Sequence, residues 1–278
     1  MKEVLILKIT VLTDNYVPYS TPFCGEHGAS YFVEDNDGTK ILMDMGKTDV
    51  FIQNALKMGI DVTDVNKITF SHGHYDHTWG LQHFIEAAKE KTKNIEMVVH
   101  PLLFDEKSEY GRDIGINTTI QDVKKHFKLT LTREPYKLSE NITYLGEIKR
   151  RFDFENKVPL GETVHNGEKH DDFIYDDSAM VYKNKEGIYI ITGCSHSGIC
   201  NIVEQAKEVS GEENILGVIG GFHLIEKNEQ LYKTIEYLEK CNIKEFYPGH
   251  CTSYDARFEM SKKLDVGVLS VGLEVFCK

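Results

Sequence analysis

Three histidines and one aspartate lie within six residues of this chain, directly after the apolar run 68–70. They are His72, His74, Asp76 and His77. Imidazole nitrogen and carboxylate oxygen are the donors that Zn²⁺ and similar first-row ions prefer. Residues two apart share a face of an extended segment, so His72 and His74 can point at one ion. Asp76 and His77 need a bend in the backbone to converge on a second ion. Asp76 alone would be an ordinary helix N-cap, but a group of this density favours metal binding.

Four other apolar runs also end in a histidine. They are 95–99 before His100, 187–192 before His196, 215–219 before His223, and 245–247 before His250. In an open α/β sheet, functional groups gather outside the carboxyl ends of the strands. The five runs that end in histidine are therefore candidates for one shared rim.

Helical patterns alternate with these predicted strands, which indicates an α/β fold. Residues 48–58, 201–209 and 230–240 have the spacing and end signals of helices. The residues after His77 show the same period at Leu81, Phe84, Ile85 and Ala88. The first histidine group is therefore expected at a strand-to-helix junction.

The segment 101–177 is charged and weakly patterned. We expect it to be an irregular insertion over the site, within a single domain that spans 1–278. Arg150 and Arg151, with Lys149 and Arg112, could bind an anionic group of a substrate. The alternative is that these basic residues form a solvated surface.

Composition and net charge limit the kinds of molecule that this protein is expected to bind. The net charge of −12 would repel a phosphate backbone, so we expect a small-molecule substrate and no nucleic acid. The first nine residues lack the pattern of a signal peptide, and no run is long enough to span a membrane. The six cysteines form no C-x-x-C pair, so free thiols are expected. These features predict a cytoplasmic protein, and they do not indicate its oligomeric state.

The spacing of the first group resembles the H-x-H-x-D-H motif of the metallo-β-lactamase superfamily. This resemblance implies a four-layer αβ/βα sandwich with the metal site at one edge, between two β-sheets. It implies that His72 and His74 bind a first ion and that Asp76, His77 and His250 bind a second. It also implies that Asp44, at the end of an early apolar run, supports the ligand loop.

The chain departs from the common superfamily pattern at two positions. Cys194 stands where many members have a metal-bridging aspartate, and there is no H-x-x-G-H segment upstream. The segments 193–201, 25–30, 220–224 and 248–252 resemble one branch of the superfamily. That branch includes dihydropterin ribofuranosylaminobenzene phosphate synthase and ferredoxin-like and other metal-dependent hydrolases.

The branch resemblance implies roles for several further residues. His196 would replace the missing histidine at the first ion. Cys194 would either bind metal or lie beside it. His223 follows a glycine pair at a strand end, so it could bind metal or contact the reacting group. We expect substrate contact or proton transfer for it, and His27 is a weaker candidate for substrate binding at the same rim.

The expected cofactor is a pair of divalent metal ions, with zinc favoured over manganese or iron. Such a pair activates water and polarises an ester or phosphoester, with Asp76 among the catalytic residues. We therefore predict a hydrolase acting on a small anionic substrate, phosphorylated or ester. A synthase-type transferase is the alternative. A di-iron oxidoreductase is disfavoured because the chain cannot contain a flavin domain, and a noncatalytic sensor is disfavoured because the ligands are all present.

Overall fold

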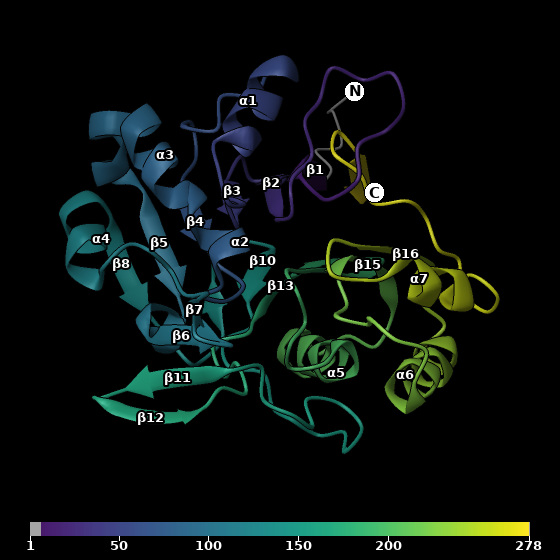
Figure 1. Ribbon diagram of the computed structural model, residues 1–278. Helices are drawn as coiled ribbons and strands as arrows, with labels where there is room; N and C mark the ends of the chain where they lie inside the picture. Colours follow the sequence, from purple (N-terminus) through teal and green to yellow (C-terminus); the bar gives the residue numbers. More distant parts are fainter. Residues whose placement is uncertain (1–6, 278) are drawn as a thin grey trace, which may run out of the picture.

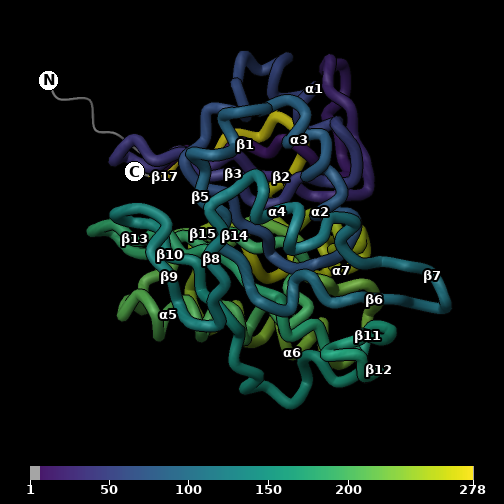
Figure 2. The backbone as a smooth tube through the Cα atoms, turned by 90° about the vertical axis from the view of Figure 1, so that its left-hand side faces the viewer, coloured from purple at the N-terminus to yellow at the C-terminus, as the bar shows by residue number. Residues whose placement is uncertain are grey.

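Two β-sheets lie face to face, and helices cover their outer faces (Figures 1 and 2). The computed structural model describes residues 7–277. Residues 1–6, on which the expectation about a signal peptide largely rests, are outside this range. The first sheet has seven strands, in the order β17 (Glu274–Cys277), β1 (Leu7–Thr13), β2 (Ser30–Glu34), β3 (Lys40–Met43), β4 (Lys67–Thr69), β5 (Glu96–Val99) and β8 (Lys128–Leu131). The second has six, in the order β16 (Glu245–Gly249), β15 (Ile215–Gly221), β14 (Gly187–Thr192), β13 (Ala179–Asn184), β10 (Ile142–Tyr144) and β9 (Tyr136–Lys137).

The helices divide between the two sheets, as Figure 2 shows with α1 and α3 above the strands and α5 and α6 below them. On the first sheet lie α1 (Val50–Lys57), α3 (Gly80–Ala88) and α4 (Ile120–His126), and on the second lie α5 (Ile199–Ser210), α6 (Glu229–Lys240) and α7 (Tyr254–Met260). The short helix α2 (Tyr75–Thr78) precedes α3, and the 3-10 turns Lys89–Asn94 and Pro101–Phe104 flank β5. The helices predicted near 48–58, 201–209 and 230–240 are confirmed.

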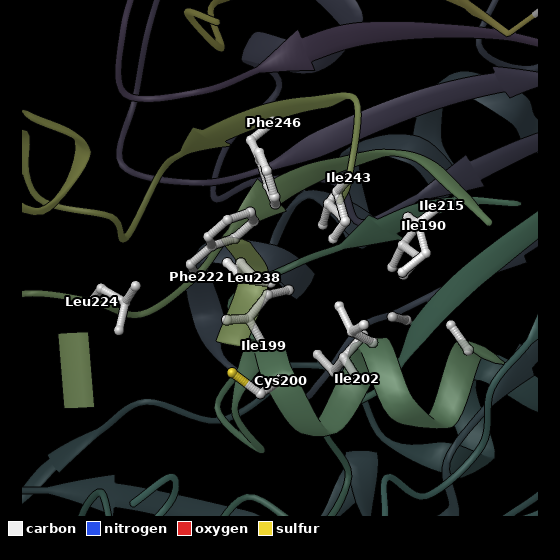
Figure 3. Packing of buried hydrophobic residues seen from close by; sticks show 14 of the residues in the cluster. Ile190, Ile199, Cys200, Ile202, Ile215, Phe222, Leu224, Leu238, Ile243 and Phe246 are labelled. Atoms are coloured by element: carbon white, nitrogen blue, oxygen red, sulfur yellow. The ribbon is translucent and has the colours of Figure 1, made fainter. Parts of the chain in front are cut away.

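The side chains of β14 alternate between two hydrophobic clusters, and this shows how the layers pack on one another. Ile188 and Ile190 pack with the helices α5 and α6, whereas Tyr189 and Ile191 pack between the two sheets. Successive side chains of a strand point to opposite faces, so a strand covered on both sides is apolar throughout. Figure 3 shows Ile199 of α5 near Phe222 in the helix-side cluster, with Ile202 further along the same helix. Helix, sheet, sheet and helix make four layers, which confirms the predicted αβ/βα sandwich.

The expectation that residues 101–177 are irregular is wrong. This segment supplies β8 to the first sheet and β9 and β10 to the second. It also forms a third sheet in the order β12 (Glu168–Asp171), β11 (Glu162–His165), β6 (Glu106–Glu109) and β7 (Arg112–Asp113), at the lower left of Figure 1. All four residues of β12 are exposed. A strand without a buried face has no hydrophobic alternation, which is why the sequence pattern did not reveal β12.

The carboxyl ends of two sets of parallel strands supply the functional residues. In the first sheet, β3, β4 and β5 are parallel, and in the second β14, β15 and β16 are parallel. The loops after these strands carry the histidines of the expected rim. Within residues 7–277, the helices are all too short or too polar to cross a bilayer.

Candidate metal centre

His72, His74 and His196 converge in the interior, and their ligand atoms lie within 4.8 Å of one another. His72 Nε2 is 2.9 Å from His74 Nδ1. The ring of His196 has its centroid 4.7 Å from that of His72 and 4.8 Å from that of His74. The Nε2 atom of His196 is buried and has no hydrogen-bond partner. Buried nitrogens that face one another without a donor between them fit a shared cation.

Asp76, His77 and His250 form a second group beside the first. His250 Nε2 is 3.2 Å from both His77 Nε2 and Asp76 Oδ2. His77 Nε2 lies 3.8 Å from Asp76 Oδ2. The structure thus brings together the residues expected at the second ion. His27 joins the edge of this group, with Nε2 3.2 Å from Asp76 Oδ2, although its side chain is 54% exposed.

Hydrogen bonds to the Nδ1 atoms orient three of these histidines. Asp44 Oδ2 lies 2.7 Å from His77 Nδ1 and accepts the Ser71 hydroxyl at 2.7 Å. The Ser71 oxygen is in turn 3.0 Å from His72 Nδ1. His250 Nδ1 is 3.0 Å from Asn15 Oδ1. Each contact leaves Nε2 free to face the cluster, as metal-bound histidines generally require.

Close backbone packing holds this network together. Gly193 follows β14, and a Cβ atom there would lie 2.0 Å from Ser71 Oγ and 2.9 Å from Asp44 Oδ2. Only glycine allows the loop of Cys194 to approach the Asp44–Ser71 pair so closely. Four non-glycine residues in these loops have positive φ angles. They are Asp44, Ser195, His223 and His250, at 57°, 58°, 46° and 47°. Strained backbone of this kind is concentrated at functional sites.

A buried lysine supports the ligand loop from the third sheet. Lys107 Nζ donates to Asp176 Oδ1 at 2.9 Å and to Asp172 Oδ2 at 3.2 Å. Asp176 Oδ2 accepts the amide of Gly73 at 2.7 Å. Gly73 lies between His72 and His74, so this ion cluster fixes the spacing of two candidate ligand histidines.

Sequence reasoning missed several of these supporting residues. Asp14 accepts the His250 amide at 2.9 Å, and Asn15 holds the His250 ring. Both directly follow β1, so the strand-end rule would have found them had it not been applied to histidines alone. Nothing in the local sequence marks Lys107 as buried, because its partners are more than 60 residues away.

The electrostatic environment keeps most of the ligand nitrogens unprotonated. Burial and neighbouring imidazoles hold the pKa values of His72 and His196 well below their usual range. Burial lowers the pKa of His74 to about 3 and that of His250 to about 4. Burial would also lower the pKa of His77, but the carboxylates of Asp44 and Asp76 raise it to about 9. Neutral imidazole is the form that binds metal, so the donor set suits a cation.

Two adjoining cavities open beside the cluster and share Leu160, His196 and His223. The first, here called the metal-site cavity, measures about 370 Å³ and is lined by His27, His74, Tyr75, Asp76, Glu109, Ile114, Leu160, Cys194, His196, His223, Ile225, His250, Cys251, Thr252 and Ser253. The second, the side cavity, measures about 380 Å³ and is lined by Phe154, Asn156, Lys157, Val158, Pro159, Leu160, Ile174, Ser195, His196, His223, Asn228, Glu229 and Gln230.

A family model described as the metallo-β-lactamase superfamily matches residues 25–207. The chain belongs to the metallo-β-lactamase superfamily. This confirms the family expected from the first motif. It also agrees with the four-layer fold and with the position of the histidine cluster between the two sheets.

Full-length relatives and a solved structure support the assignment to this superfamily. The chain is 33% identical over 264 residues to 7,8-dihydropterin-6-methyl-4-(β-D-ribofuranosyl)-aminobenzene-5'-phosphate synthase of Methanocaldococcus jannaschii, covering 90% of this chain and 89% of the relative. It is 33% identical over 258 residues to an uncharacterized protein of the same organism, covering 91% and 94%. A crystal structure described as a metal-dependent hydrolase of the β-lactamase superfamily aligns with a TM-score of 0.83 and 29% identity, covering 97% of this chain and 98% of the other.

Cys194 stands where many superfamily members have a metal-bridging aspartate. In this structure it lies inside the histidine cluster. Its sulfur is buried and lies 3.1 Å from His77 Nε2. Burial raises the pKa of this thiol well above its usual range in the absence of a cation. Cys251, which the sequence analysis did not include among the candidate ligands, lies next to it, with its thiol 3.5 Å from the Cys194 carbonyl oxygen.

His223 lies where the two cavities meet. Its ring centroid is 4.3 Å from that of His196, and burial lowers its pKa. It belongs to none of the groups of described residues whose ligand atoms lie close enough together to hold an ion. Its position suits contact with a substrate in either cavity.

The structure corrects the expectation for Arg150 and Arg151. Arg150 donates to the carbonyl oxygens of Ile148 and Ile174, and Arg151 pairs with Glu208 on α5. Neither arginine is among the described residues that line the two cavities. Both guanidinium groups are engaged by protein acceptors away from the cluster, so they are not placed to bind a substrate there.

Two other candidates for an active-site role also lie elsewhere. Arg112 is exposed on β7, and His100 is buried with its Nε2 atom 3.1 Å from Glu147 Oε2.

Proposed function

We propose that this protein is a divalent-metal-dependent hydrolase that acts on a small anionic substrate, either phosphorylated or an ester. The observation that carries the proposal is the convergence of two ligand groups at one cavity. His74 and His196 of the first group and Asp76 and His250 of the second all line it. Zinc is the favoured metal because the donors are mostly imidazole nitrogens, while manganese and iron are the alternatives.

Two bound divalent ions would attract an anionic substrate to the metal-site cavity. When bound, two divalent ions supply Lewis acidity that activates water and polarises the scissile bond. The predicted ligands include four histidines held neutral by burial, so they do not balance the charge of two such ions. Among the described residues that line the metal-site cavity, no lysine or arginine adds a competing anion site. A substrate anion would therefore be drawn toward the ligand groups themselves.

We propose that His223 accepts the proton released in the reaction. The pKa of His223 is lowered by burial, so the ring is neutral near pH 7 and can accept a proton. His27, at the exposed edge, is placed to contact the substrate, and its Nε2 atom lies beside Asp76 Oδ2. Asp76 Oδ2 thus contacts both His27 at the exposed edge and His250 within the second ligand group.

A transferase of the synthase type is the second candidate. One relative carries the name of such a synthase and aligns over 90% of this chain. The side cavity adds an independent observation, because it adjoins the metal-site cavity and includes Phe154, Val158 and Lys157. A reaction with two substrates needs room for both, and these residues offer an apolar surface and one cation.

We also infer a cytoplasmic location. All six cysteines are free thiols in the structure, and a reducing compartment keeps thiols in that form.

A substrate screen separates the two activities. Zn²⁺- and Mn²⁺-loaded protein is incubated with phosphodiesters, lactones and thioesters, and separately with a ribofuranosyl-aminobenzene phosphate and a dihydropterin activated by a phosphorylated leaving group. Hydrolysis of a member of the first panel, lost in His223→Ala, supports the hydrolase. Formation of a condensed product with release of a phosphorylated leaving group, without hydrolysis of the panel, would replace the hydrolase with the transferase.

A further inference from the structure

The sulfur of Cys194 lies between the two ligand groups. It shares one set of donor atoms, all within 4.8 Å of one another, with His72 and His77. It shares a second such set with His250 and Cys251. His72 belongs to the first ligand group and His250 to the second. The sulfur of Cys194, which belongs to neither group, is therefore within reach of both.

We propose that Cys194 bridges the two metal ions through its thiolate sulfur. The inference rests on the proposed function only in requiring that two ions bind. It assigns to one sulfur atom the bridging position that an aspartate is expected to hold in many superfamily members. A sulfur atom can bind two ions at once because it has several lone pairs, whereas a carboxylate usually bridges through its two separate oxygens.

The surroundings of Cys194 fit a ligand better than a structural thiol. Its residue is 3% exposed, and His77 Nε2, a donor atom of the second group, is 3.1 Å from the sulfur. The backbone that carries the thiol is held in place, because Gly193 packs against Ser71 and Asp44 and the Cys194 carbonyl is contacted by Cys251. On metal binding the S–H bond breaks, the sulfur keeps the electron pair, and the proton leaves to solvent.

Cys251 provides a matched control. It lies in the set with Cys194 and His250 but in none with a residue of the first ligand group. Its thiol is directed at the Cys194 carbonyl oxygen. Because this thiol is engaged by the carbonyl and shares no set with the first ligand group, we expect Cys251 to bind neither ion, and its loss cannot remove a bridge.

Cobalt substitution tests the ligand. Metal-depleted wild type, Cys194→Ser and Cys251→Ser are titrated with Co²⁺, and the near-ultraviolet band of thiolate-to-cobalt charge transfer is recorded. We expect the band in wild type and Cys251→Ser and its loss in Cys194→Ser. Circular dichroism checks that each variant is folded, and Cys194→Asp, which restores a carboxylate, should bind two ions without the band. A band that survives in Cys194→Ser, or is absent from cobalt-loaded wild type, overturns the proposal.

Cadmium NMR tests the bridge itself. Wild type loaded with two equivalents of ¹¹³Cd²⁺ should give two resonances, both displaced toward the thiolate range, and both should shift back in Cys194→Ser. A shift of only one resonance would show a terminal thiolate and overturn the bridge. These outcomes are distinct from failure of the proposed function. If the spectra are as expected but the substrate panel is not hydrolysed, the bridge stands and the hydrolase falls. If wild type binds no metal, both fall.

Discussion

Asp44 Oδ2 lies 2.7 Å from His77 Nδ1, and this contact directs the Nε2 atom of His77 toward Asp76, His250 and Cys194. The carboxylate also accepts the amide and the hydroxyl of Ser71, at 2.8 Å and 2.7 Å. One side chain thereby sets the orientation of a ligand histidine and the position of the strand end that carries His72.

Asp44→Asn should weaken metal binding by about 10- to 100-fold, the usual cost of losing a residue that orients a metal-bound histidine. An amide cannot accept hydrogen bonds through both of its terminal atoms, so either Ser71 or His77 Nδ1 would lose its acceptor. Competition with a chromogenic chelator measures the affinity. Asp64→Asn, at an exposed ion pair with Lys40, is the matched control and should leave the affinity unchanged. Equal affinities for wild type and Asp44→Asn would contradict the orienting role.

His196→Ala and His223→Ala should separate metal binding from turnover. We expect His196→Ala to lose metal from the first ligand group. We expect His223→Ala to keep its metal and to lose at least about 100-fold in turnover, typical of a missing proton-transfer group. Elemental analysis and steady-state kinetics on the same samples measure both. The exposed His83 supplies the control His83→Ala. The opposite pattern would exchange the two roles.

Lys107→Met should lower the free energy of unfolding by about 3–5 kcal/mol, because it leaves Asp172 and Asp176 buried without their cation. Urea denaturation measures the change. Lys125→Met removes an exposed lysine that pairs with Asp122 and should leave the free energy of unfolding nearly unchanged. A loss for Lys107→Met as small as that of the control would show that the buried cluster does not stabilise the ligand loop.

The buried carboxyl of Glu155 should make the free energy of unfolding depend on pH. Its carboxylate accepts the amides of Cys200 and Asn201 at the start of α5, and burial raises its pKa from 4.5 to about 7. The folded state therefore binds this proton more tightly than the unfolded state does. Protonated Glu155 makes its full contribution to the free energy of unfolding below pH 4.5, and this contribution is lost as the pH rises through 7. The full change in the free energy of unfolding is about 3 kcal/mol.

Urea denaturation at pH values from 5 to 8 tests this linkage in wild type and Glu155→Gln. Asp14 and Asp177 also have raised pKa values, each about 6, and contribute a slope of the same sign in both proteins. The difference between the two slopes thus isolates Glu155. We expect a flatter dependence on pH in the glutamine variant. Parallel curves would show that Glu155 has the same pKa in the folded and unfolded states.

The sequence predicted the parts of this structure that depend on local pattern. Strands such as β14 and helices such as α5 repeat their buried positions at short, regular intervals, and the ligands at 72–77 are dense enough to stand out. Lys107 could not be predicted, because its burial depends on two aspartates 65 and 69 residues away. The third sheet was missed because β12 buries none of its residues. Arg150 looked available to a substrate, but its backbone acceptors are visible only in the folded chain.

Metal stoichiometry tests the central claim most directly. Protein depleted with a chelator, reloaded with Zn²⁺ and passed through a desalting column is analysed by inductively coupled plasma mass spectrometry. Two His-rich ligand groups predict two zinc ions per chain in wild type and a loss confined to one ion in His196→Ala. Less than about half an equivalent in wild type, with no binding of Mn²⁺ in its place, would contradict a metal centre of the kind these ligands form.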